Sequence, residues 1–64
     1  MTKIFIEKDY ANNIFYYKEG TYLLHREDGP AVEWNDGDRD YWLHGEYYEY
    51  VKTDEEWLIL QIIN

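Results

Sequence analysis

The chain has 64 residues, of which 14 are acidic and 6 basic, and its formal net charge at pH 7 is −8. It contains no cysteine and two histidines, which excludes disulfides and a cysteine–histidine zinc site. Its aromatic content is 20%, whereas disordered chains contain few aromatic residues. No apolar run reaches the roughly 18 residues that span a bilayer, so the composition predicts one soluble cytoplasmic domain over residues 1–64.

The first fifty residues predict short strands separated by turns. The expected strands cover residues 4–6, 14–17, 21–24, 31–34, 39–43 and 46–51. The strongest turn signal is Asn35-Asp36-Gly37, because Asn and Gly accept the positive φ angles of a tight hairpin. Strands at this spacing predict an antiparallel meander of five or six strands over residues 1–52.

A C-terminal helix is predicted over residues 53–64. Thr53 and Glu56 have the spacing of a capping box, and the three acids 54–56 suit the positive end of a helix dipole. Six of the seven residues 57–63 are apolar, which is more than one buried stripe requires. The expected fold is therefore α+β, a twisted sheet with this helix across one face. The surplus apolar surface predicts a weak homodimer through Trp57, Leu60 and Ile63.

An internal echo links two parts of the predicted sheet. The pattern Y-x-L-H-x-E occurs at residues 22–27 and again at 41–46, an offset of 19. The string HREDGPA at residues 25–31, followed by N-D-G and by Trp42-Leu43-His44-Gly45, resembles hairpin repeats of many small phage and giant-virus proteins. Those repeats are similar to variant MORN repeats.

The resemblance covers residues 22–46. It implies an elongated antiparallel sheet, a viral or phage origin and the host cytoplasm as location, but no established activity. A T-x-E-E-aromatic segment often opens a capping helix in such proteins, and residues 53–57 fit it. The chain departs from the pattern because it holds one complete unit instead of several, and residues 1–20 match nothing in it.

The charge balance favours some partners over others. Carboxylates outnumber the scattered basic residues more than twofold, so direct binding to nucleic acid or to an anionic membrane is not expected. A basic protein surface would be attracted instead. The net charge can also serve only to keep a tyrosine-rich surface in solution.

A partner-binding surface is predicted between residues 36 and 50. Its members are Asp36, Asp38, Asp40, Trp42, Glu46, Tyr47, Tyr48, Glu49 and Tyr50. Aromatic side chains among carboxylates are typical of interface hot spots, although a two-sided aromatic strand can also lie between sheet and helix. The alternating aspartates are not a calcium loop, because tyrosines occupy the positions that need Gly and Glu. No metal and no cofactor is predicted.

One cluster has the residue types of acid–base chemistry. His25, Glu27 and His44 would suit a small phosphodiesterase or ribonuclease, although the negative charge around them repels phosphate. In the alternative, His25 stabilises the tight Asp28-Gly29 turn and Arg26 pairs with a nearby carboxylate. The chain contains neither serine nor cysteine, which excludes the hydrolases that use those nucleophiles.

The sequence thus favours a non-enzymatic acidic interaction module. A phage-encoded inhibitor of a nuclease or defence complex fits this class, and a nucleic-acid mimic is its sharpest form. The phosphodiesterase remains open, and so does a repeat fragment that joins a larger assembly through a sheet edge.

Overall fold

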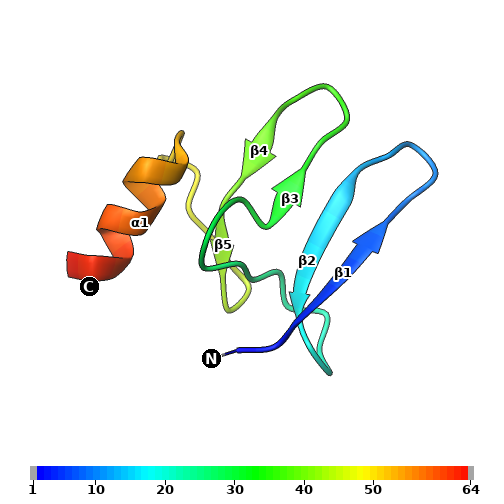
Figure 1. Ribbon diagram of the computed structural model, residues 1–64, viewed down its shortest axis with the longest axis horizontal. Coiled ribbons are helices and arrows are strands. Elements are labelled where there is room, and N and C mark those ends of the chain that lie inside the picture. Colours follow the sequence, from blue (N-terminus) through cyan, green and yellow to red (C-terminus); the bar gives the residue numbers. More distant parts are fainter. Residues whose placement is uncertain (1, 64) are drawn as a thin grey trace.

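A computed structural model describes residues 2–63 and contains six short strands followed by one helix (Figure 1). The elements are β1 (Ile4–Lys8), β2 (Ile14–Lys18), β3 (Val32–Glu33), β4 (Arg39–Asp40), β5 (Trp42–Leu43), β6 (Glu46–Tyr47) and α1 (Asp54–Ile63). Strands β1 to β4 form an antiparallel sheet in chain order, and β5 and β6 form a separate hairpin. The predicted α+β class is confirmed; the predicted ends at residues 1 and 64 lie outside the described residues.

The register of the four-stranded sheet sorts its side chains onto two faces. Phe5 pairs with Tyr17, and Phe15 pairs with Val32, which in turn pairs with Asp40. Directly paired residues of antiparallel strands point to the same side, so these five side chains share one face. The opposite face carries Ile14, Glu33 and Arg39, and the Arg39 guanidinium lies 4.0 Å from Asp54 at the start of α1.

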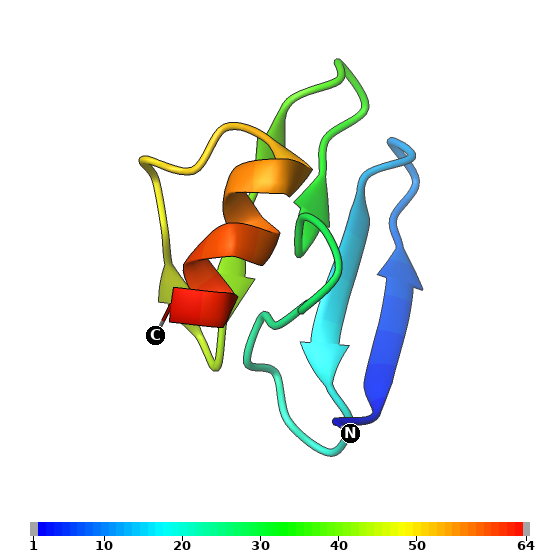
Figure 2. The same ribbon diagram turned by 60° about the vertical axis from the view of Figure 1, so that its left-hand side comes forward.

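The core lies between α1 and the β5–β6 hairpin. Trp57 is fully buried, and its ring centroid lies 5.4 Å from that of Tyr41 and 5.1 Å from that of Tyr48. The Trp57 indole N–H donates a 2.9 Å hydrogen bond to the carbonyl of Arg26. The helix therefore packs on Tyr41, on β5 and on the segment that follows β6, whereas β1 and β2 extend away to one side (Figure 2).

The helix begins as the capping box predicts. The Glu56 amide donates to the Thr53 hydroxyl at 3.1 Å, and the Thr53 amide donates to the Glu56 carboxylate at 3.0 Å. These two reciprocal bonds satisfy amides that the first turn would otherwise leave unpaired. Within residues 2–63, no helix is long and apolar enough to cross a membrane.

The strand predicted at residues 21–24 is wrong. Only an isolated bridge between Tyr17 and Leu24 forms there. The Thr21 hydroxyl donates to the Lys18 carbonyl and accepts from the Leu23 amide, so a turn takes the place of a ladder.

Three other predicted strands are shorter than expected. The strand predicted at residues 31–34 forms only over Val32–Glu33. Residues 39–43 divide at Tyr41, whose side chain turns into the core. Residues 46–51 end as a strand at Tyr47, because Tyr48 packs on Trp57 and the Val51 amide closes a turn onto the Tyr48 carbonyl. The two-sided aromatic strand predicted for this segment is therefore wrong.

Candidate functional site

The histidines of the acid–base cluster lie together inside the fold. His25 is fully buried, its ring centroid is 4.4 Å from that of His44, and its Nδ1 accepts a 2.9 Å hydrogen bond from the His44 amide. The ring proton consequently sits on Nε2, 3.9 Å from a Glu27 carboxylate oxygen. Burial, and then the nearby His44, lower the pKa of His25. The turn that His25 stabilises is His44-Gly45, not the predicted Asp28-Gly29.

This arrangement explains the repeated sequence pattern by contact between its two copies. His44 has a φ of 52°, and Gly45 follows with a φ of 83°. A residue with positive φ is strained, and its conformation is stabilised when its amide has a hydrogen-bond acceptor. The buried His25 ring provides that acceptor for the His44 amide. A ring sealed from solvent cannot reach a phosphate group, so the geometry gives the phosphodiesterase hypothesis no support.

Arg26 has the local pairing that the sequence predicts. Its guanidinium donates to Asp28 at 2.9 Å and to Glu33 at 2.7 Å, and it lies 4.1 Å from the centre of the Tyr16 ring. Burial disfavours the charged form, but the bonds to Asp28 and Glu33 outweigh it and raise the pKa of Arg26. Nε and Nη1 of the guanidinium are thus bonded within the chain.

Three of the nine predicted partner-binding residues lie together: Asp40, Trp42 and Tyr47. The Trp34 indole N–H donates to one oxygen of Asp40 at 2.8 Å, and the Tyr47 hydroxyl donates to the other at 3.4 Å. The Trp42 and Tyr47 rings stack at 5.0 Å. Burial and then the charge of Asp40 raise the pKa of Tyr47. We call Trp34, Asp40, Trp42 and Tyr47 the Asp40 cluster.

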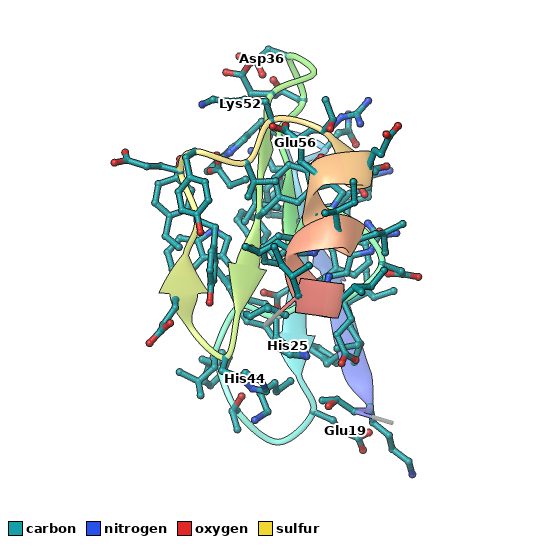
Figure 3. All side chains as sticks on the ribbon, turned by 90° about the vertical axis from the view of Figure 1, so that its left-hand side faces the viewer. Glu19, His25, Asp36, His44, Lys52 and Glu56 are labelled. Atoms are coloured by element: carbon teal, nitrogen blue, oxygen red, sulfur yellow. The ribbon has the colours of Figure 1, made fainter. Side chains whose placement is uncertain are left out.

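An open groove of about 540 Å³ adjoins the Asp40 cluster, between the β3–β4 hairpin and residues 47–52. Its lining includes three carboxylates and two basic side chains: Asp38, Asp40, Glu49, Arg39 and Lys52. Figure 3 places Asp36 and Lys52 at the end of the molecule opposite His44. The groove is therefore well separated from the histidine pair.

The other predicted partner residues are dispersed. The Asp36 carboxylate accepts from the Asp38 amide within the hairpin turn, and Tyr48 contributes to the groove while its ring packs on Trp57. Glu46 lies on β6 beyond the groove lining, and Tyr50 is exposed on the helix side. Among residues 2–63, no group of three His, Cys, Asp or Glu side chains is placed to hold a metal ion.

The helix surface differs from the prediction at one residue. Trp57 is buried, so it cannot contribute to self-association, and this part of the prediction is wrong. Leu60 packs at the edge of the core, and Ile63 is exposed. The exposed apolar side chains of α1 are Leu58, Ile59, Ile62 and Ile63. Self-association through this helix stays a prediction.

Sequence reasoning missed Trp34, which holds the second oxygen of Asp40. Its contact with Asp40 was predictable by counting outward from the hairpin turn, because Trp34 and Asp40 lie on one face when Val32 pairs with Asp40.

Comparisons with protein-family models, with curated proteins and with solved structures find no match for the chain. The resemblance to MORN-like repeats and the viral origin therefore stay predictions.

Proposed function

We propose that the protein is a non-enzymatic binding module that accepts a basic segment of a partner protein at the Asp40 cluster and its groove. The observation that supports this proposal is the fixed position of the Asp40 carboxylate. Both of its oxygens are held by aromatic side chains, from Trp34 and Tyr47, which are themselves partly exposed.

The cluster offers what a lysine or arginine side chain needs. A carboxylate already held in place loses little conformational freedom on binding, and each oxygen keeps a lone pair free for a donor. The faces of the stacked Trp42 and Tyr47 rings attract cations. Asp38 and Glu49 on the groove add negative charge beside the same point.

The net charge adds long-range attraction to this local chemistry. A charge of −8 speeds encounter with a basic surface and repels acidic competitors. Asp38 and Asp40 both line the groove, and in this proposal their two carboxylates take the place of neighbouring phosphates. The partner in this proposal is a nucleic-acid-binding protein, and the consequence of binding is inhibition by occupation of its basic cleft.

The proposal is tested with a labelled peptide rich in arginine and lysine, titrated by fluorescence anisotropy at low and moderate salt. Asp40→Asn removes one charge from the cluster, and Glu55→Gln removes one charge from the exposed start of the helix. We expect Asp40→Asn to weaken binding about tenfold, as for truncation of a well-placed charge, and Glu55→Gln less than about threefold. Equal losses of affinity in the two variants would show that binding depends on net charge alone, and this result would refute the site.

A further inference from the structure

Strand β1 forms one edge of the four-stranded sheet, and within residues 2–63 it pairs only with β2. The Lys3 carbonyl accepts from the Glu19 amide at 2.9 Å, and the Asp9 amide donates to the Asn13 carbonyl at 3.1 Å. Backbone groups in an antiparallel pair alternate in direction along the strand. The odd-numbered residues of β1 thus bond to β2, and Ile4, Ile6 and Lys8 direct their amides and carbonyls outward.

The side chains of this edge have a self-complementary order. Lys3, Phe5 and Glu7 point to one face, and Ile4 and Ile6 point to the other. Phe5 is 49% exposed and Ile6 is 58% exposed, so half of each remains uncovered in a single copy. The strand carries neither a proline nor a bulge, which are two of the devices that block pairing at an edge. Edge charges are a third device, but here Lys3 and Glu7 are of opposite sign.

We propose that a second copy of the chain pairs antiparallel with β1 about a two-fold axis at Phe5. Phe5 then faces Phe5 of the second copy, and Lys3 faces Glu7 of the second copy on each side of the axis. Ile4 and Ile6 of the second copy exchange the outward backbone hydrogen bonds. The backbone direction fits this register, because the outward-facing residues Ile4 and Ile6 meet each other.

The alternative registers fit less well. Moving the axis by one residue places Ile4 or Ile6 on it, and Phe5 then faces Lys3 or Glu7 of the second copy. Both opposite-charge pairs are lost in either case, and directly opposed pairs are the main source of register preference between strands. Of these three registers, only the one with its axis at Phe5 places opposite charges across from each other and Phe5 across from Phe5.

The proposed pairing also extends an aromatic row that each copy already has. Phe5 lies 6.4 Å from Tyr17, and Tyr17 lies 6.3 Å from Phe15 and 5.9 Å from Tyr22, all measured between ring centroids. Contact between the two Phe5 rings joins the rows of both copies along one face of an eight-stranded sheet. The Asp40 cluster is at the opposite edge of the sheet, so this pairing does not depend on the proposed function.

Charge reversal tests the register by sedimentation at about 0.15 M ionic strength, where the Debye length is about 8 Å. Lys3→Glu and Glu7→Lys should each weaken the dimer about tenfold, because each opposes like charges at two symmetric points, and the double variant should restore it. Net charge alone predicts opposite effects for the two variants: Lys3→Glu makes each copy more negative and should weaken the dimer, whereas Glu7→Lys makes each copy less negative and should tighten it. Weakening by Glu7→Lys is therefore the result that separates the register from net charge. A double variant no tighter than the single variants would overturn the proposal, as would a strictly monomeric wild type at high micromolar concentration.

Disulfide formation provides a second readout, because the chain has no cysteine of its own. Phe5→Cys should oxidise to a covalent dimer much faster than Ile6→Cys, which reports the neighbouring register, and faster than Tyr10→Cys, which lies in the exposed β1–β2 turn. Equal rates for the three variants would refute the axis at Phe5. Ile62→Glu, on the exposed surface of α1, should leave dimerisation unchanged. If Ile62→Glu abolished the dimer while the β1 variants still dimerised like the wild type, the contact would be assigned to α1 instead.

Discussion

Trp57 holds α1 on the rest of the protein. Its side chain is fully buried against Tyr41 and Tyr48, and its indole N–H is the donor for the Arg26 carbonyl. Trp57→Ala removes packing worth about 3–5 kcal/mol and leaves that carbonyl unpaired at a further cost of about 1–3 kcal/mol. A domain of this length has a free energy of unfolding of about 3–10 kcal/mol. We therefore expect Trp57→Ala to lose cooperative unfolding at room temperature.

Trp57→Phe separates the packing contribution from the hydrogen bond. It keeps a ring in the core, and it should lower the free energy of unfolding by about 1–3 kcal/mol, measured by urea denaturation followed by circular dichroism. Trp34→Phe is the control, because its bond to Asp40 lies at the surface and should contribute less than about 1 kcal/mol. A wild-type midpoint for Trp57→Ala, or equal losses for the two Phe variants, would refute this description of the core.

Further variants test the turns, the cap and the buried histidine. Because burial lowers the pKa of His25 below its ordinary 6.5, the unfolded chain takes up a proton first as the pH falls. The free energy of unfolding should be highest above pH 6.5 and decline below it. His25→Asn should flatten this decline, and an undiminished decline in that variant would contradict the assignment. Gly45→Ala should lose about 2 kcal/mol in urea denaturation, since φ is +83° and the new Cβ would lie 2.9 Å from a leucine methyl. Gly37→Ala, with φ +96° and open space around it, should lose about 1 kcal/mol, and equal losses would show that the close approach has no effect. Thr53→Ala should lower the free energy of unfolding by about 1 kcal/mol and reduce the helical dichroism; an unchanged midpoint would argue against the cap.

Features decided by neighbouring residues were predictable from the sequence. The helix start depends on Thr53 and Glu56, which are three residues apart, and the β3–β4 hairpin depends on the turn at Asn35-Asp36-Gly37. Both follow from hydrogen bonds and φ preferences within a few residues. Those elements appear where the sequence places them.

Features decided by distant contacts were not predictable in the same way. The strand predicted at residues 21–24 is an exception with a local cause: the apolar content suits a strand, but the Thr21 hydroxyl captures the backbone groups of Lys18 and Leu23 that a ladder would need. The alternation of side chains along residues 46–51 predicts a strand that includes Tyr48. The Tyr48 ring packs on Trp57 instead, and the strand ends at Tyr47. The offset of 19 showed that His25 and His44 occupy matching positions of the two copies, but not that their rings lie in contact, 4.4 Å apart between centroids.

The most direct test of the central proposal is an NMR titration of the nitrogen-15-labelled protein with the arginine- and lysine-rich peptide. The chain has three tryptophans, and their indole N–H signals divide between the site and the core. We predict saturable shifts of the Trp34 and Trp42 indoles and of the Asp40 and Tyr47 amides, with the Trp57 indole unmoved. Shifts spread evenly over exposed acidic residues, with the Trp34 and Trp42 indoles unmoved, would contradict binding at the Asp40 cluster.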